Sequence, residues 1–562
     1  MKYLSYIFVM LLSASIALAD NNPANTLAKM LLEKAGVRAT ICEMPRVGDG
    51  RLAAALAQLG IAQVHALAPD AKAAAAASPP AEDAGALGSQ VLIETGTPDA
   101  LPLGDWVADL YLVADATDAN LKTLSAAEAG RVLSPYRGIA LVGNPAGAKA
   151  KLSKSALATW ARGTGGTVTI AEGADGLWAV VKMPPLKGGD DWGHYYHGPD
   201  NNPVSTDAAF SGTNYQLQAV GYSFLGFRNE TTVASSGRCF TANSSIYGDS
   251  CINMWYQIPP EIVARSLYNA QILWRRAIPE QYGEMGSSLV ATPDKFYMKD
   301  GNGVLILNPE TGAQIARVPV TTGPNFVRWI ALQDDVLLTL VGPRPYDALI
   351  DGVTQVDNAA KMFPVWKDSY RCSELTAWSA TTYKPLWKYP ATAPAGDINA
   401  NLMAVNGKTI YLLAHENTAV ALDLNTGAPR WSKPTTEPRL VTNYSGNAWR
   451  TYVGEPMALA TDAAYVIFHG VYQQFQAFAA ADGTLLWDLS GKEYPGTDAV
   501  AITSKHTILF PGKAIEIPNG RNDSRGAGMV EWTGVRGFGG RLGVLPGRRH
   551  RRTLLALPCC AE

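Results

Sequence analysis

The chain has 562 residues, of which 47% are hydrophobic and 17% are charged, and its formal net charge is −2. That length leaves room for two or more domains at about 150 residues each. The small net charge excludes a partner that binds through bulk electrostatics, such as nucleic acid or an anionic membrane surface.

Residues 1–19 are predicted to be a secretory signal peptide. Lys2 supplies a positive charge, an apolar run extends from Tyr6 to Leu12, and Ala17-Leu18-Ala19 forms an A-x-A cleavage site. The apolar run is shorter than the ~20 residues of a membrane span. We therefore expect an exported protein, periplasmic or secreted, with no membrane span once the signal is cleaved.

Residues 20–185 are predicted to form a Rossmann-like α/β domain. Helical patterns cover residues 27–34 and 51–59, and the Ala-rich stretch 71–84 is expected to be a helix that runs into a loose loop. Strands are expected at 38–42, 63–67, 91–94, 108–113 and 138–142, with a closing hairpin at 168–170 and 177–181. Alternating strands and helices predict a mostly parallel sheet.

Residues 186–210 are expected to be a junction segment. His194 and His197 lie three positions apart, and Asp191 is close to both in sequence. Histidine and carboxylate side chains in this pattern predict a divalent-metal site. The alternative is that the neighbouring aromatic residues, Trp192 among them, fasten the linker while the histidines form hydrogen bonds.

Residues 211–525 are predicted to form an all-β propeller. A turn recurs at 308–312, 423–427 and 482–483, and a Trp follows two of these copies, with weaker copies ending at Trp274 and Trp387. Glycine supplies the positive φ of such a turn, and we expect the Trp to pack between neighbouring units. The spacing fits four-stranded blades, about seven to eight in a ring that is incomplete if the chain beyond 525 is not part of it.

The turn and Trp phrases resemble PQQ-like (pyrroloquinoline-quinone-like) repeats over residues 215–515. That superfamily includes quinoprotein alcohol dehydrogenases and the propeller lipoprotein of the outer-membrane assembly machine. With the Trp-x-His-Tyr-x-His and Asn-Asn pattern of residues 192–202, nearly the whole chain is similar to a group of exported bacterial proteins typical of planctomycetes. These proteins join a methyltransferase-like domain to a PQQ-like propeller.

The resemblance implies an S-adenosylmethionine site after the first strand. Gly48 and Gly50 match the last two glycines of a G-x-G-x-G turn, but Arg46 stands at the first. Ala68 stands where a ribose-binding carboxylate is expected, with Asp70 displaced beyond a proline. We interpret Gly48, Asp49 and Gly50 as vestigial cofactor-binding residues of a degenerate domain, with active methyl transfer as an alternative.

A quinoprotein dehydrogenase would need Ca²⁺ held by oxygen ligands, a catalytic carboxylate and a Trp beneath the quinone. Asp334, Asp335, Asn443 and Trp449 supply suitable groups, but no arrangement singles out a site, and no catalytic residue is assigned. The expected function is an exported binding or scaffolding module that takes a protein or glycan on a propeller face. A periplasmic oxidoreductase that uses PQQ with Ca²⁺ is the main alternative.

Two further features concern cysteines and the end of the chain. Cys239 and Cys251 lie twelve positions apart, so we expect a local disulfide, with two buried thiols as the alternative. Residues 526–562 lack the repeat pattern and carry a basic run at 548–552 and a Cys pair at 559–560. We interpret them as an off-pattern tail, disordered or produced by a shifted reading frame.

Overall fold

The computed structural model describes residues 22–36, 41–209, 229–243, 261–278, 288–343, 371–390, 398–399, 403–414, 418–435, 456–470, 475–489, 501–502, 507–510, 513–516, 521–522, 536–537 and 541–542. The chain divides into two compact units. The first contains Met1–Leu186, Ser236–Arg238 and Arg265–Trp274, and the second contains the remaining residues.

The first unit is built on a seven-stranded sheet with the strand order β3-β2-β1-β4-β5-β7-β6. Strands β1 to β5 pair in parallel, and β7 runs antiparallel to both β5 and β6. This arrangement confirms the predicted Rossmann-like domain. The strands are β1 (Ile41–Met44), β2 (Gln63–Ala68), β3 (Val91–Thr95), β4 (Leu110–Val113), β5 (Ile139–Pro145), β6 (Thr167–Gly173) and β7 (Gly176–Lys182).

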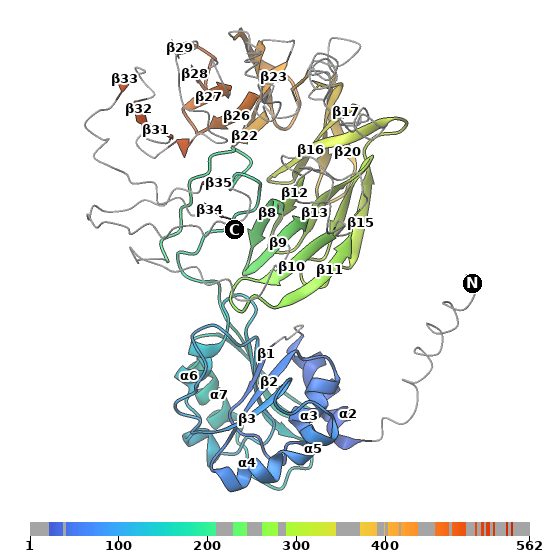
Figure 1. Cartoon of the computed structure of the whole chain (residues 1–562), viewed down its shortest axis with the longest axis vertical. Coiled ribbons are helices and arrows are strands. Elements are labelled where there is room, and N and C mark those ends of the chain that lie inside the picture. The colour runs from blue at the N-terminus through green and yellow to red at the C-terminus, as the bar shows by residue number, and fades with distance from the viewer. Residues whose placement is uncertain are drawn as a thin grey trace, which may run out of the picture. The chain divides into compact units, whose positions relative to one another are not determined.

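Helices cover both faces of this sheet and enclose two apolar cores (Figure 1). One core is formed with α2 to α5, and the other with α6 and α7. The stretch expected to end in a loop forms two helices instead, because Pro79 and Pro80 suit the first turn of a new helix. The helices are α2 (Pro23–Ala35), α3 (Arg51–Gln58), α4 (Ala71–Ala77), α5 (Pro79–Asp83), η1 (Asn120–Lys122), α6 (Ala126–Val132) and α7 (Lys154–Arg162).

Among the described residues, the rest of the chain forms six four-stranded sheets whose neighbouring strands follow chain order. The first three sheets are β8 (Asn229–Ser235), β9 (Arg238–Asn243), β10 (Glu261–Ser266) and β11 (Ile272–Ala277); β12 (Leu289–Ala291), β13 (Phe296–Asp300), β14 (Gly303–Leu307) and β15 (Gln314–Pro319); β16 (Asn325–Gln333), β17 (Val336–Pro343), β19 (Glu374–Ser379) and β20 (Pro385–Pro390).

The other three sheets repeat the pattern, and two short strand pairs accompany them. The sheets are β22 (Met403–Asn406), β23 (Thr409–Ala414), β24 (Thr418–Asp423) and β25 (Pro429–Pro434); β26 (Pro456–Thr461), β27 (Tyr465–Gly470), β28 (Phe475–Ala479) and β29 (Leu485–Asp488); β30 (Ala501–Ile502), β31 (Thr507–Phe510), β32 (Lys513–Glu516) and β33 (Arg521–Asn522). The pairs are β18 (Arg371–Cys372) with β21 (Ile398–Asn399), and β34 (Arg536–Gly537) with β35 (Arg541–Leu542).

The third, fourth and fifth sheets pack on one another through the repeated Trp and Gly. The Trp387 indole N–H donates to the carbonyl of Leu424 in the next sheet at 2.9 Å, and the Trp431 indole N–H donates to Ala480 at 3.0 Å. Each indole also covers the glycine of that next turn: a Cβ on Gly427 would lie 2.4 Å from the Trp387 ring. The predicted packing of Trp between neighbouring sheets is therefore confirmed. The close contact with the indole is a second reason, besides the positive φ, why the turn contains glycine.

The recurring turn is held by its own side chain. Asp423 Oδ1 accepts hydrogen bonds from the amides of Asn425 and Thr426, both at 3.0 Å, and Gly427 has a φ of 71°. Asn308 does the same ahead of Gly312. An Asp or Asn at the start and a Gly at the end are therefore both required by the local backbone.

Several predicted features lie outside the described residues: the signal peptide, Cys251, Asn443, Trp449 and most of the tail. The Cys239–Cys251 disulfide consequently stays a prediction. In the part of the chain that the structure describes, no helix combines the length and hydropathy needed to cross a bilayer.

Candidate functional site

The turn that contains Gly48, Asp49 and Gly50, which we interpret from the sequence as a vestigial cofactor site, lies directly after β1 at the carboxyl edge of the sheet, where open α/β sheets bind their ligands. Gly48 and Gly50 have positive φ angles of 61° and 79°. A Cβ on Gly50 would lie 1.8 Å from the carbonyl oxygen of Ala77 at the end of α4. Asp49 Oδ1 accepts a hydrogen bond from the Arg51 amide at 3.1 Å. Gly50 is thus required by contact with the chain itself.

An ion pair joins the ends of β1 and β4, the point at which the strand order of the sheet reverses. Arg46 donates to Asp115 through Nε at 3.0 Å and through Nη2 at 2.8 Å. The hydrogen bond to Asp115 raises the pKa of Arg46. A guanidinium and a carboxylate therefore occupy the switch point at which doubly wound folds bind cofactors.

Asp70, the carboxylate nearest in sequence to the position of the missing ribose ligand, has a structural role. Asp70 Oδ1 accepts a hydrogen bond from the Ala73 amide at 2.8 Å and so caps the N-terminus of α4. Ala68 ends β2 and is fully buried. The three departures from the methyltransferase pattern are therefore each explained by local contacts.

Sequence reasoning missed a buried acid–base chain in the middle of the sheet. Glu43 on β1 lies beside His65 on β2, and their Oε2 and Nδ1 atoms are 2.5 Å apart. On its other side, His65 Nε2 lies 3.4 Å from Oε2 of the exposed Glu94. The only signal in the sequence was a charged residue inside each of two apolar strands.

The surroundings of Glu43 and His65 favour the binding of a proton in the folded state. Burial raises the pKa of Glu43 although His65 opposes the shift. Burial alone would lower the pKa of His65, but the hydrogen bonds and charges of Glu43 and Glu94 outweigh it and raise the pKa. The folded domain therefore holds a proton between two strands more tightly than the unfolded chain does.

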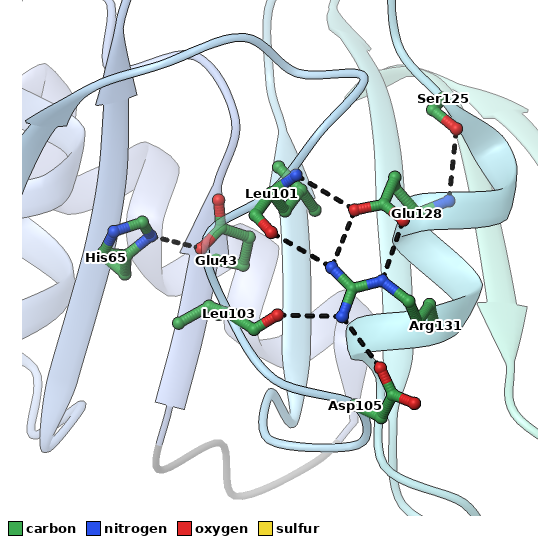
Figure 2. A network of polar contacts seen from close by, with 8 residues as sticks. All are labelled: Glu43, His65, Leu101, Leu103, Asp105, Ser125, Glu128 and Arg131. Carbon is green, nitrogen blue, oxygen red and sulfur yellow. Dashed lines mark hydrogen bonds and ion pairs between the residues drawn. The ribbon is translucent and has the colours of Figure 1, made fainter.

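Figure 2 shows the hydrogen bonds that hold the loop following β3 to α6. Arg131 on α6 donates to the carbonyls of Leu101 and Leu103, at 3.1 and 2.8 Å, and pairs with Glu128. The Leu101 amide donates to Glu128 Oε2 at 2.9 Å. The loop that follows β3 is thus tied to α6 by a charged cluster.

The junction residues predicted to bind a metal each have a different hydrogen-bond partner. His194 Nε2 accepts from the Leu332 amide at 3.1 Å, and burial lowers the pKa of His194 to about 3, so the ring is neutral. His197 Nε2 lies 2.8 Å from Asp190 Oδ2. Asp191 Oδ2 accepts from Ser235 at 2.6 Å. The metal site therefore stays a prediction.

The same segment accepts one amide hydrogen from the first strand of each of the six sheets. Each donor lies at the last or next-to-last position of its strand. The acceptors are Trp192 O, Gly193 O, His194 Nε2, Pro199 O, Asp200 O and Asn202 Oδ1, and the donors are Ala234, Ala291, Leu332, Val405, Thr461 and Ile502. Six strands far apart in the sequence therefore meet on eleven consecutive residues, 192–202.

The groups considered for Ca²⁺ and PQQ do not fit such a site where the structure describes them. Asp334 is paired with Lys408 at 2.6 Å. Asp335 accepts from Ser379 at 2.9 Å and from Thr381 at 2.7 Å. In the described parts of the chain, no three His, Cys, Asp or Glu side chains are grouped to hold a metal ion. Asp334 and Asp335 therefore have partners within the protein: Lys408 for the first, and Ser379 and Thr381 for the second.

One family model matches part of the region that forms the four-stranded sheets. Residues 369–504 match the family described as outer membrane protein assembly factor BamB. No curated protein is similar in sequence to this chain.

Solved structures show distant likenesses. A europium-containing methanol dehydrogenase has 10% identity and a TM-score of 0.36, over 57% of this chain and 61% of its own. BamB from Moraxella catarrhalis has 11% identity and a TM-score of 0.27, over 47% of this chain and 66% of its own. The chain thus spans less than two thirds of either protein.

A third likeness concerns an α/β enzyme. A putative S-adenosyl-L-methionine-dependent methyltransferase from Methanococcus maripaludis has 18% identity and a TM-score of 0.25, over 29% of this chain and 85% of its own. At such scores none of the three structures carries a function over to this chain.

Proposed function

We propose that the chain is an exported binding or scaffolding module rather than an enzyme, because residues 369–504 match the family described as outer membrane protein assembly factor BamB. Its ligand is a protein or a glycan held on the loops of the β-sheet unit. The matching family is described as an assembly factor, which favours a protein partner over a glycan.

The observation that carries this proposal is the position of residues 192–202. Propellers use the space where their first strands converge as a ligand channel or funnel. Here the chain itself contacts the first strand of each of the six described sheets, through acceptors that include His194 and Asn202. A cofactor at these strand ends would have to displace a hydrogen-bonded segment, whereas loop surfaces stay available for a partner.

The α/β unit supports the same reading independently. Its switch point holds the Arg46–Asp115 ion pair, and Asp70 caps a helix. A half-exposed ion pair contributes only about 0.2–1 kcal/mol, so it is no strong barrier to a ligand. The features that count against a bound cofactor are Arg46 in place of the first glycine and Ala68 in place of the ribose carboxylate.

The alternative is a periplasmic oxidoreductase that uses PQQ with Ca²⁺. It is tested by incubating the full chain with both and measuring dye-linked oxidation of alcohols and sugars. We expect no turnover above a blank that lacks protein. Turnover that requires both PQQ and Ca²⁺ would contradict the binding-module proposal.

The partner is tested by immobilising the full chain and measuring surface plasmon resonance. The probes are an unfolded β-barrel outer-membrane protein and a glycan array. Saturable binding to the unfolded barrel protein supports the assembly-type role, and binding to one glycan class supports the glycan reading. Failure of both probes to bind would overturn the proposed protein or glycan ligand, whatever the oxidation assay gives.

A further inference from the structure

The two ends of the 192–202 segment reach the first and the sixth sheet. Trp192 and Ala234 exchange both backbone hydrogen bonds, at 2.9 and 2.7 Å. The side-chain amide of Asn202 donates to the Ile502 carbonyl at 2.9 Å and accepts from the Ile502 amide at 2.8 Å, across 300 positions of sequence. Asn202 thus completes an edge strand as a backbone amide would.

Neighbouring sheets are also joined by Trp–carbonyl hydrogen bonds, but among the described residues no strand is shared between the first and the last sheet. Strands within each four-stranded sheet follow chain order, so no strand from one end of the repeat array completes the sheet at the other end. The first strands instead neighbour one another: β8 lies by β12, β12 by β16, β22 by β26, and β26 by β30. The 192–202 segment is the element that all six share.

The segment keeps its path through unusual backbone angles. His197 has a φ of 81° and Asn201 a φ of 55°. Non-glycine residues adopt such angles when their surroundings hold them. His197 is held by Asp190 and by an edge-on contact with Trp192, and Asn201 Nδ2 donates to the Met403 carbonyl at 2.6 Å.

We propose that residues 192–202 are an axial clasp that binds the carboxyl ends of the first strands and holds the first and last described sheets in one ring. The surface formed by those strand ends is therefore a peptide-binding surface, and its occupant is the chain's own junction segment. This assigns a physical role to the Trp-x-His-Tyr-x-His and Asn-Asn pattern, in which His194, Asn201 and Asn202 each supply a side-chain bond to a different strand.

The test is Asn202→Asp in the full chain, read by hydrogen exchange with mass spectrometry. A carboxylate has nearly the same shape as the amide but cannot donate to the Ile502 carbonyl. Because a buried acceptor loses its partner, we expect amides in residues 501–522 to exchange about tenfold faster or more. Amides of β13 and β14, which the segment does not bind, should exchange at the original rate.

Asn425→Asp is the matched control, because it makes the same chemical change in an exposed turn. It should leave residues 501–522 unchanged. If Asn202→Asp yields no folded protein, Asn202→Ser is measured in the same way, since serine is too short to bridge both Ile502 groups. Unchanged exchange in residues 501–522, or equal acceleration in all sheets, would overturn the clasp.

Discussion

Several residues that the sequence places at cofactor or metal positions have hydrogen-bond or ion-pair partners within the protein. Arg46 is paired with Asp115, Asp70 caps α4, and His194 accepts a strand amide. The Asp70 contact caps a helix, and the His194 contact satisfies a buried ring nitrogen. The residue types therefore predict that these positions make polar contacts, but they do not predict which groups are the partners.

The Glu43–His65 pair could not be derived from the sequence, because it requires the register of two parallel strands that are separated by α3. Each residue alone has the appearance of a polar exception in an apolar strand. The strands themselves were predictable, because their apolar runs are long enough to define them.

We predict that the α/β unit loses stability as the pH rises. The pKa values of Glu43 and His65 are both raised in the folded state, so the fold binds more protons than the unfolded chain. Their stabilising contribution is complete below the unfolded pKa values, about 4.5 for Glu43 and 6.5 for His65. It is then lost as the pH passes the folded values.

This prediction is checked by thermal unfolding between pH 6 and pH 9, measured with a signal that reports on the α/β unit. Glu43→Gln removes the main partner of His65 and should flatten the decline. Glu82→Gln, an exposed change on α5, should leave the wild-type slope. An identical slope in Glu43→Gln would show that the pair is not linked to protons.

A second prediction concerns Asp200. Burial raises its pKa to about 6 from 3.8, while His197 opposes and Asp462 adds to the shift. A raised carboxyl pKa stabilises the fold at low pH, and that contribution is lost as the pH rises through about 6. Asp200→Asn should therefore stabilise the β-sheet unit at pH 8 by up to about 3 kcal/mol, with little effect at pH 4.

Denaturant titrations at the two pH values measure the difference. Asp482→Asn is the control, because hydrogen bonds from Thr484 lower the pKa of Asp482 in its exposed turn. It should not stabilise the protein at pH 8. Equal stability of Asp200→Asn and the unchanged chain at pH 8 would contradict the prediction.

At the scale of elements, the turn, the glycine and the indole form one unit that links two sheets. Asp423 fixes the turn, and Trp387 from the preceding sheet lies against Gly427. The turn and the Trp that follows it were predictable, because Asp423, Gly427 and Trp431 lie close together in one repeat. The extent of the contact was not, because the indole and the glycine belong to different repeats.

Two glycine substitutions separate backbone strain from crowding. Gly407 has a φ of 53° and nothing within 4 Å of an added Cβ. Gly407→Ala should therefore cost only about 1–2 kcal/mol, the cost of a left-handed residue. Gly427→Ala also drives a methyl group into Trp387, and should cost about 1–3 kcal/mol more. Chemical denaturation measures both, and equal losses would contradict the Trp–Gly contact.

At the scale of the whole molecule, the sheets of the second unit are organised by a segment that precedes them in sequence. Repeats and strands were predictable from local patterns. The path of residues 192–202 was not, because its partners extend to Ile502, 300 positions away from Asn202. The pattern of two histidines and aspartates predicts a metal site, and it gives no sign of the hydrogen bonds that the same segment makes with distant strands.

The most direct test of the contacts made by residues 192–202 is native-state hydrogen exchange of the unchanged chain across a denaturant series. The six amides that donate to residues 192–202 are followed: Ala234, Ala291, Leu332, Val405, Thr461 and Ile502. If the segment binds all six first strands, these amides open together with one free energy and one denaturant dependence. Six different opening free energies, with the Ile502 amide exchanging as fast as an unprotected amide, would contradict the proposed binding of all six strands.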